Sequence, residues 1–404
     1  MSTPAGGELR REVGLAGAVL VGLGSMVGTG VFVSLSLAVD IAGSAVLWAV
    51  AAAAVVALCN GLSSAQLAAA HPVAGGTYEY GYRYLHPVAG LVAGWMFVLA
   101  KSASAATAAL GIAAYVGLGA RRLPALATVL VLTLLVVAGL RRSNQANAAV
   151  VVVSVGSLVA VCIAGWEAAA SVPGPPAGGL PEIAEAAALV FVAFTGYGRV
   201  ATLGEEIRDP RSSIPKAVVA TVAVAALLYL GVAFVLSRLG GTDDASPLIG
   251  VAASAGGRAL EVSVRVGALA AMVGVLLNLL LGLSRVVLAM GRRGDLPAAT
   301  AVVHRQGRSP TVAVVVAAAV VAAFVLVGSI RLTWSFSALT VLVYYAITNI
   351  AALRQPAEQR RVPLVVQIVG LSGCVALAVF LDPVMWLWAA AVVVLGVTWR
   401  SIRS

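Results

Sequence analysis

The stretch Gly24-Ser25-Met26-Val27-Gly28-Thr29-Gly30 decides the fold, because it places three glycines inside a long apolar run near the N-terminus. The run extends from Gly14 to Ala38, which is long enough for a helix to cross a bilayer core at ~20 residues per span. Glycine in a helix interior costs about 1 kcal/mol relative to alanine, so the backbone is predicted to open here. In hydrocarbon, an open backbone is tolerated only where it is buried in protein or lines a cavity. Its freed N–H and C=O groups can then bind a polar solute.

The composition is that of a polytopic membrane protein. The chain has 404 residues, of which 61% are hydrophobic and only 10% are charged, and its mean hydropathy is +1.02. Soluble domains carry about 25% charged residues. No apolar N-terminal segment ends in a small-residue cleavage site, so we expect the first span to stay in the product. The three cysteines lie scattered inside apolar runs, without metal spacing or a disulfide framework, so neither a metal site nor a cofactor is expected.

Twelve apolar runs are candidate spans, and no linker between them is long enough to separate soluble domains. The runs cover residues 14–38, 44–69, 89–117, 123–140, 146–166, 183–203, 216–238, 264–290, 311–328, 332–353, 363–380 and 384–399. The longer connections are expected at 70–88, 167–182, 204–216, 239–263 and 291–310. The whole chain, 1–404, is therefore predicted to form a single membrane unit.

The net charge of +10 indicates membrane topology rather than nucleic-acid binding. With the N-terminus placed inside the cell, 17 lysines and arginines, among them Arg293 and Arg400, fall on the inner side. Six fall on the outer side: Arg121, Arg122, Arg238, Arg258, Arg265 and Arg331. The acidic residues divide evenly between the two sides. An inner excess of cations alone is what the positive-inside rule requires. We therefore expect both termini in the cytoplasm, a multi-pass protein of the plasma membrane (a bacterial inner membrane), and no nucleic-acid partner.

A second break matches the first in the sixth span. The run Phe191-Val192-Ala193-Phe194-Thr195-Gly196-Tyr197-Gly198-Arg199 again places glycines at mid-membrane depth. Interrupted segments at matching positions in two halves are the strongest sequence pointer to a transporter binding site. Spans one and six match if the chain is built as 5 + 5 + 2 helices, with halves at 14–166 and 183–353 and two further helices at 363–399. An odd number of helices in each half makes the two halves inverted repeats.

Motifs around these breaks resemble those of the amino acid–polyamine–organocation (APC) superfamily. The segment from Gly24 to Phe32 is similar to the family's G-x-x-x-G-[ST]-G-[IV]-F. The other matching motifs are Pro72-Val73-Ala74-Gly75-Gly76-Thr77-Tyr78, Gly94-Trp95, Gly204-Glu205-Glu206-Ile207-Arg208-Asp209-Pro210 with Ile214-Pro215, Ser284-Arg285 and Gly294-Asp295-Leu296-Pro297. These motifs follow one another in the order and spacing of the family.

The resemblance implies a leucine-transporter-like inverted-repeat fold with broken helices 1 and 6, and transport of amino acids or related amines. The substrate carboxylate would meet backbone N–H groups at the first break, and the α-amino group would meet carbonyls at both breaks. Half-helix N-termini suit a carboxylate and half-helix C-termini an ammonium. Phe194 and Tyr197 would cover the substrate. The substrate-binding residues so implied are Met26, Gly28, Thr29 and Gly30 at the first break, and Val192, Ala193, Phe194, Thr195, Gly196 and Tyr197 at the second.

Polar side chains within the spans add further candidates. Lys101 lies about twelve residues into span three, at a depth where a charge costs roughly 2.5–3.5 kcal/mol. We expect it to border the central cavity and to take part in coupling, with a lysine paired to backbone carbonyls as the alternative. Ser284 is the span-eight hydroxyl that a sodium site would use, and Asn278 would give the substrate a neutral contact. Arg199 is expected either to pair with Glu205 or Glu206 or to contact the substrate.

The sequence thus predicts a secondary transporter for a neutral amino acid, working by alternating access and driven by protons (or sodium) or by exchange. The middle of spans one, three, six and eight holds no carboxylate, which argues against dicationic substrates, but a carrier of cationic amino acids or polyamines stays open. An intramembrane enzyme would need a nucleophile with its base, or a metal cluster, at depth, and the spans hold neither. The paired breaks favour a carrier over a channel. For the first break alone, an ordinary helix packed through small residues is the alternative.

Overall fold

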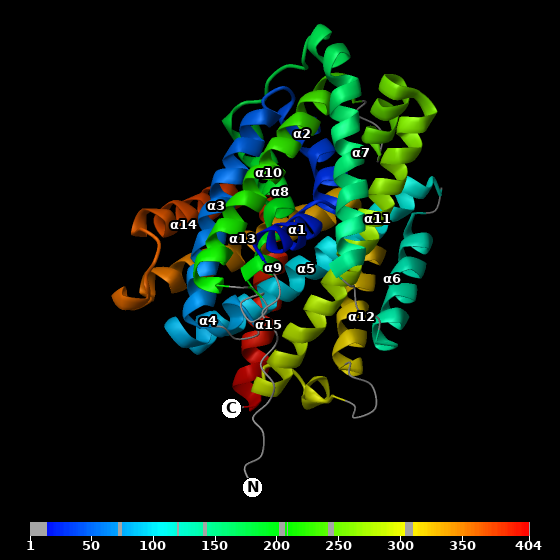
Figure 1. The fold of residues 1–404 in the computed structure, drawn as a ribbon. Helices are drawn as coiled ribbons and strands as arrows, with labels where there is room; N and C mark the ends of the chain where they lie inside the picture. Colours follow the sequence, from blue (N-terminus) through cyan, green and yellow to red (C-terminus); the bar gives the residue numbers. More distant parts are fainter. Residues whose placement is uncertain are drawn as a thin grey trace.

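The computed structural model describes residues 14–71, 75–118, 121–139, 144–201, 207, 209–240, 246–303 and 310–403, and the described residues are almost entirely helical (Figure 1). The helices are α1 Leu15–Met26, η1 Gly30–Ser34, α2 Leu35–Ala42, α3 Val46–Ala70, α4 Thr77–Tyr84, α5 Pro87–Val116, α6 Arg122–Val137, α7 Asn144–Ser171, α8 Leu180–Phe194, α9 Tyr197–Ala201, α10 Pro210–Leu239, α11 Pro247–Arg293, η2 Ala298–Ala301, α12 Thr311–Val327, α13 Ile330–Arg354, η3 Ala357–Gln359, α14 Leu364–Val379 and α15 Pro383–Arg403. No strand forms within these ranges. The prediction of an all-α polytopic membrane protein is confirmed.

Each of the twelve predicted spans contains a helix. In the described part of the chain, eight helices are long and apolar enough to cross a membrane, and the bent pair formed by α1 and η1–α2 makes a ninth. The other three, α6, α12 and α14, are apolar helices of 16 or 17 residues. At a rise of 1.5 Å per residue they reach about 25 Å, slightly less than the thickness of a hydrocarbon core.

Local sequence signals set the ends of the helix at the centre of the bundle, α5. Pro87 occupies its first turn, where the missing N–H is not needed, and the His86 side chain accepts a hydrogen bond from the Val88 N–H at 3.3 Å. The helix ends at Gly117, which has a φ of 79°. α11 ends in the same way at Gly294, with a φ of 86°. Glycine takes this left-handed conformation without a Cβ penalty.

Burial separates the helices at the centre of the bundle from those at its surface. α5 and α13 are the most buried spans, and α5 packs against α11, α12 and α13. Large apolar side chains such as Trp48, Ile163 and Leu227 are more than 70% exposed. Exposed apolar surface on this scale marks an interaction surface, and in a polytopic protein it faces lipid.

Two connections that were expected to be loops contain helix. α4 lies inside the expected 70–88 connection, and α11 begins at Pro247, inside the expected 239–263 connection. Gly257, with a φ of 65°, interrupts the helical geometry of α11 and bends it. Neither segment is an apolar run, because α4 carries polar and charged side chains and the start of α11 carries small ones. Hydropathy therefore did not mark them as helices.

The segment before α8 is fastened to the end of α2. The Gly178 N–H donates to the Ala42 carbonyl at 3.0 Å, and an isolated bridge joins Gly43 to Ala177. Gly43 has a φ of 56°, and a Cβ there would overlap the carbonyl of Pro176, so only glycine fits. Because α2 and α8 also pack along their lengths, the second half of span one and the first half of span six are joined at their far ends.

Candidate substrate site

The first span opens at the predicted glycine break. α1 ends at Met26, Val27 takes an extended conformation (ψ 98°), and the second half starts at Gly30 with a bend of 41° between the halves. The second half begins as a turn of π-helix, a feature frequent at functional sites. Its Phe32 N–H donates to the Gly28 carbonyl at 3.2 Å. The N–H groups that precede Phe32 therefore lie in the first turn, where a helix leaves them without helical partners.

The two breaks lie against each other. The sixth span opens between α8 and α9, at Thr195 and Gly196. A Cβ on Gly196 would come within 2.5 Å of the carbonyl carbon of Ser25, and a Cβ on Gly30 would overlap Ala193. Glycine at these two positions therefore allows the broken segments to touch through their backbones. The structure thus brings the two predicted sets of binding residues together.

A tyrosine that the sequence analysis did not single out joins the two breaks. Tyr229 of α10 is fully buried, its hydroxyl donates to the Met26 carbonyl at 2.8 Å, and it lies 3.3 Å from the Ala193 carbonyl. These are two of the carbonyls predicted to meet the substrate ammonium. The Tyr229 ring packs on Phe194, with ring centroids 4.9 Å apart. The hydroxyl therefore supplies a hydrogen-bond donor at a point between the breaks where an ammonium would supply one.

Thr29 places an unpaired hydroxyl at the first break. Its side chain is 2% exposed, and Oγ1 makes no hydrogen bond to the part of the chain that the structure describes. Leaving a buried polar group unpaired costs about 1–3 kcal/mol, so most buried polar groups in native proteins have a partner. Thr29 stands between Gly28 and Gly30, two of the residues predicted to bind the carboxylate, so its hydroxyl is a candidate partner for a bound ligand.

Lys101 of α5 reaches the break of the sixth span. Its Nζ donates to Thr195 Oγ1 at 3.0 Å, and Thr195 Oγ1 donates in turn to the Val192 carbonyl at 2.8 Å. A chain of hydrogen bonds thus runs from the amine to one of the carbonyls predicted to meet the substrate ammonium. This position fits the expectation that Lys101 borders the site from span three.

Phe194 and Tyr197, which were expected to cover the substrate, are fully buried. The Tyr197 ring packs on Tyr345 with centroids 5.3 Å apart, and Tyr345 packs on Tyr344 at 5.1 Å. The Tyr344 hydroxyl accepts a hydrogen bond from the Thr77 N–H at 3.1 Å. This row of aromatic side chains connects the sixth-span break to α4.

The two candidates on α11 lie at different distances from the breaks. Gly28 faces α11, because a Cβ there would overlap Val275. Asn278 is three residues from Val275 and so lies on the same helix face, about one turn away. Ser284 is nine residues from Val275, about 13 Å along the helix, and its hydroxyl donates to the Leu281 carbonyl at 2.9 Å. The structure brings Asn278 near the first break but not Ser284.

Part of the predicted site falls outside the described residues. This applies to Glu205 and Glu206, the expected partners of Arg199, and to residues 72–74, 204 and 208 of the family motifs. Arg199 itself is exposed in α9. Its pairing with either glutamate therefore stays a prediction.

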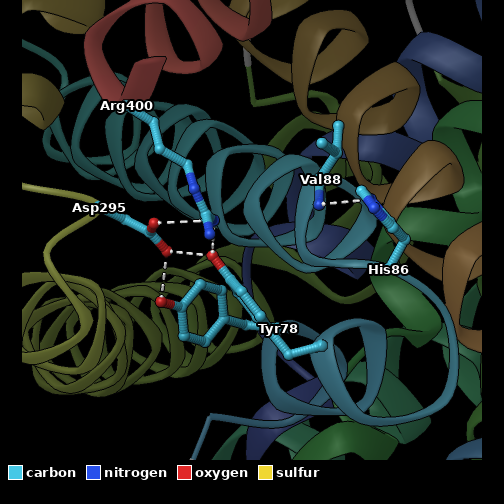
Figure 2. A network of polar contacts seen from close by, with 6 residues as sticks. Tyr78, His86, Val88, Asp295 and Arg400 are labelled. Atoms are coloured by element: carbon cyan, nitrogen blue, oxygen red, sulfur yellow. Dashed lines mark hydrogen bonds and ion pairs between the residues drawn. The ribbon is translucent and has the colours of Figure 1, made fainter. Parts of the chain in front are cut away.

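At the C-terminal end of α11, three helices (α4, α11 and α15) meet around one buried carboxylate (Figure 2). Asp295 is 2% exposed and accepts hydrogen bonds from the hydroxyls of Tyr78 at 2.6 Å and Tyr82 at 2.7 Å, both on α4. Arg400 reaches the other carboxylate oxygen from α15, with Nη1 at 3.2 Å, and also bonds the Tyr82 hydroxyl. We call Tyr78, Tyr82, Asp295 and Arg400 the Asp295 junction. Sequence reasoning quoted Asp295 within a motif but did not assign it these partners.

The protonation of the two tyrosines follows from this environment. Burial, together with hydrogen bonding to Asp295, raises the pKa of Tyr78 and of Tyr82 above the usual value. Both hydroxyls therefore stay protonated donors at neutral pH. Beside them, Arg293 pairs with Glu79 and lies over the Tyr82 ring, with 4.1 Å from its guanidinium carbon to the ring centroid. α4 is thus held to the end of α11 by charge.

The chain is similar to transporters over most of its length. The family model described as amino acid permease matches residues 17–399. An uncharacterised transporter of Mycobacterium tuberculosis is 42% identical over 404 residues, covering 98% of this chain and 92% of that protein. Two Bacillus subtilis proteins also match: the branched-chain amino acid permease at 28% identity (76% of this chain, 72% of that one) and the methylthioribose transporter at 25% (94% and 90%). With the paired breaks and the APC motifs, these matches show that the chain belongs to the amino acid permease family of the APC superfamily.

Proposed function

We propose that this protein is a secondary transporter that carries neutral amino acids across the plasma membrane by alternating access. The observation that supports this most is the contact between the two broken spans. A zwitterion matches the groups that meet there. Its carboxylate would bind the N–H groups of Gly28, Thr29 and Gly30, and its ammonium the carbonyls of Met26 and Ala193.

In this proposal the chain is a single transport unit built from two inverted halves. The halves are 14–166 and 183–353, and 363–399 adds two helices. The breaks occupy the first helix of each half and touch each other, which supports an inverted-repeat arrangement around one site. Alternating access then requires one group of helices to move against the other around this fixed site.

The placement of cations supports cytoplasmic termini. Arg293 and Arg400, predicted to be inside, both contact the α4 end of the bundle. Arg121 and Arg331, predicted to be outside, line one cavity beside α2. The two predicted groups therefore gather at separate places, as the positive-inside rule expects of opposite membrane faces.

A neutral substrate suits the groups around the breaks better than a cationic one. The Lys101 amine lies 3.0 Å from the Thr195 hydroxyl, so the ionisable side chain that reaches the second break is basic rather than acidic. In the described part of the chain, the hydrogen bonds at the breaks come from hydroxyl, amine and backbone groups. The names of the relatives include both substrate classes, since the Bacillus subtilis relative is named for branched-chain amino acids and an Arabidopsis thaliana relative at 27% identity is named for cationic ones. A carrier of cationic amino acids or polyamines, the alternative, would need an acidic partner at this place.

Transport by the purified protein in liposomes tests the proposal. The panel comprises neutral and cationic amino acids, putrescine and methylthioribose, each with a proton gradient, with a sodium gradient, and with unlabelled solute inside for exchange. We expect a neutral amino acid to be transported fastest, under a proton gradient or by exchange. If arginine or putrescine is preferred, the cationic alternative replaces the proposal. If no amino acid moves under any condition, the proposed function is wrong.

Coupling to protons is proposed to involve Lys101. Lys101→Ala removes the amine next to Thr195, so we expect uptake to lose its pH dependence. Lys216→Ala is the matched control, because Lys216 is exposed at the start of α10. Thr195→Val should mimic the lysine variant and Thr195→Ser should not, since serine keeps the hydroxyl that links the amine to the break. If the uptake of Lys101→Ala keeps the pH dependence of the wild type, Lys101 has a structural role and takes no part in coupling.

The carboxylate position is tested at Thr29, whose hydroxyl makes no hydrogen bond to the residues that the structure describes. Thr29→Val keeps the shape of the side chain, so we expect the protein to stay folded while KM for the amino acid rises about tenfold, equivalent to one charge-assisted hydrogen bond of ~1.4 kcal/mol. Thr340→Val is the control, since that buried hydroxyl donates to a carbonyl of its own helix α13. Gly28→Leu is the stronger variant and should abolish binding in a protein that still inserts. Normal affinity in both Thr29→Val and Gly28→Leu rules out this carboxylate position.

A further inference from the structure

A cavity of about 380 Å³ lies beside α2, at the end of the second half of the first span. Its volume falls in the range of small-molecule pockets, about 300–1,000 Å³. The residues that line it come from η1–α2, the end of α5, the start of α6 and the start of α13: Val33, Ser36, Leu37, Asp40, Leu110, Arg121, Arg122, Gly328, Ser329, Ile330 and Arg331. No part of this set belongs to the two breaks.

One face of the half-helix that follows the first break forms a wall of this cavity. Val33, Ser36, Leu37 and Asp40 have the spacing of a single helix face. Val33 lies three residues beyond Gly30, which corresponds to about 5 Å along the helix. The cavity therefore begins about one helical turn from the proposed carboxylate position and extends away from it.

The charged residues of the lining are mostly basic. They are three arginines, Arg121, Arg122 and Arg331, and one carboxylate, that of Asp40. The Arg331 guanidinium is already near Glu185, at 3.6 Å, whereas Arg121 and Arg122 are exposed and form no ion pair with the residues that the structure describes.

Two helix starts add to this charge. α6 begins at Arg122 and α13 at Ile330, so both helices start at the cavity lining, and the Ser329 side chain caps α13 by accepting from the Leu332 N–H. Helix N-termini carry a partial positive charge and bind anions. Leu37, Leu110 and Ile330 supply apolar wall. The cavity thus combines anion-binding groups with apolar surface, which is the chemistry of a carboxylate that carries an apolar side chain.

We propose that this cavity is an outer capture site, in which Arg121 and Arg122 hold the carboxylate of an amino acid before it moves along α2 to the breaks. The proposal rests on the proposed transport function and adds a second binding position and two specificity-determining residues to it. A positive cavity raises the local concentration of anionic groups and the rate of their capture. It also disfavours solutes with a net positive charge.

The test measures substrate uptake by cells that express the wild type or a variant. The substrate is added only from outside, at low ionic strength. The probe is labelled L-leucine, or the amino acid that the wild type transports fastest. For the double variant Arg121→Gln/Arg122→Gln we expect KM to rise about five- to tenfold with an unchanged maximal rate. At high salt the difference should shrink to less than about twofold, because salt screens exposed charges. Arg121→Lys/Arg122→Lys keeps the charge and should restore KM to within about twofold.

Arg258→Gln is the matched control. Arg258 is also exposed and predicted to be outside, but it does not line the cavity, so its KM should stay at the wild-type value. If KM is unchanged in Arg121→Gln/Arg122→Gln, the capture site is wrong while the transport function still stands. The same holds if KM rises as much in Arg258→Gln as in the double variant. A wild type that transports no amino acid overturns the transport function as well.

An anionic lipid headgroup offers the same chemistry as a carboxylate, and a second measurement separates the two. In liposomes of phosphatidylcholine alone, the double variant should show the same rise in KM as in cells. If the rise appears only when phosphatidylglycerol is present, the cavity binds the lipid headgroup, and the assignment to the amino acid is wrong.

Discussion

The two breaks and the Asp295 junction hold helices together by different means. At the breaks the contact is one of shape, since a Cβ on Gly196 would lie 2.5 Å from the facing backbone. At the junction, a carboxylate that is 2% exposed gathers Tyr78, Tyr82 and Arg400. The centre should therefore be sensitive to added volume, whereas the junction should be sensitive to lost charge. Each of the following experiments tests one side of this difference.

The largest effect is expected for Gly196→Ala. The added methyl group would meet backbone, which cannot rotate away as a side chain can, so the breaks must separate. We expect uptake to fall at least about a hundredfold, equivalent to ~2.7 kcal/mol, in a protein that still reaches the membrane. Gly156→Ala is the control, because a Cβ there meets nothing within 4 Å. Normal transport by Gly196→Ala would show that the contact between the breaks is not needed.

The next largest effect is expected for Asp295→Asn, measured as thermal stability in detergent. Removing one partner of a buried ion pair costs up to 3–5 kcal/mol, but asparagine still accepts from the tyrosines, so we expect a loss of about 2 kcal/mol. Asp382→Asn should be neutral. Asp382 is an exposed carboxylate that accepts from the Val384 N–H at the start of α15, and asparagine caps helices as well as aspartate does. If both variants are neutral, charge does not hold the junction together.

Tyr229→Phe should show a smaller effect that depends on substrate. It removes the hydroxyl between the Met26 and Ala193 carbonyls, so we expect a loss of about 1 kcal/mol in thermal stability without substrate. A bound amino acid would return a donor to these carbonyls, so saturating substrate should recover most of the loss. Tyr115→Phe is the control, because its buried hydroxyl donates to the Phe32 carbonyl instead. If saturating substrate does not recover the lost thermal stability of Tyr229→Phe, the substrate ammonium does not bind the Met26 and Ala193 carbonyls.

The smallest effect is expected from pH at the junction. Burial raises the pKa of Tyr78 and Tyr82 above the unperturbed value of ~10. A group with a raised folded pKa contributes its full stabilisation below the unfolded pKa and loses it as pH rises through the folded pKa. The stability difference between the wild type and Tyr78→Phe/Tyr82→Phe should therefore be the same at pH 6 and pH 9 and should fall as the pH rises above ~10. A difference that stays constant above that pH would contradict the raised pKa values.

The features predicted from sequence are those with a local signal. Both breaks stand out because glycines interrupt apolar runs, and Lys101 stands out because a charge lies in one. Tyr229 gave no such signal, since an aromatic residue in an apolar run is ordinary and its role arises only when α10 packs against both breaks. The Asp295 junction was missed for a related reason. Tyr78, Tyr82 and Arg400 each lie more than 100 residues from Asp295 along the chain, and only the packing of three helices brings them together.

The fastening of Gly178 to Ala42 has a mechanical consequence. η1–α2 supplies the proposed carboxylate-binding end of the site and α8 supplies carbonyls, yet the two half-helices are joined at their far ends through Gly43 and Ala177. Movement of one half-helix relative to the other would break the Gly178–Ala42 hydrogen bond and the Gly43–Ala177 bridge. We therefore expect the two half-helices to move as one unit about the breaks, so that the two ends of a bound zwitterion would be released together rather than one after the other.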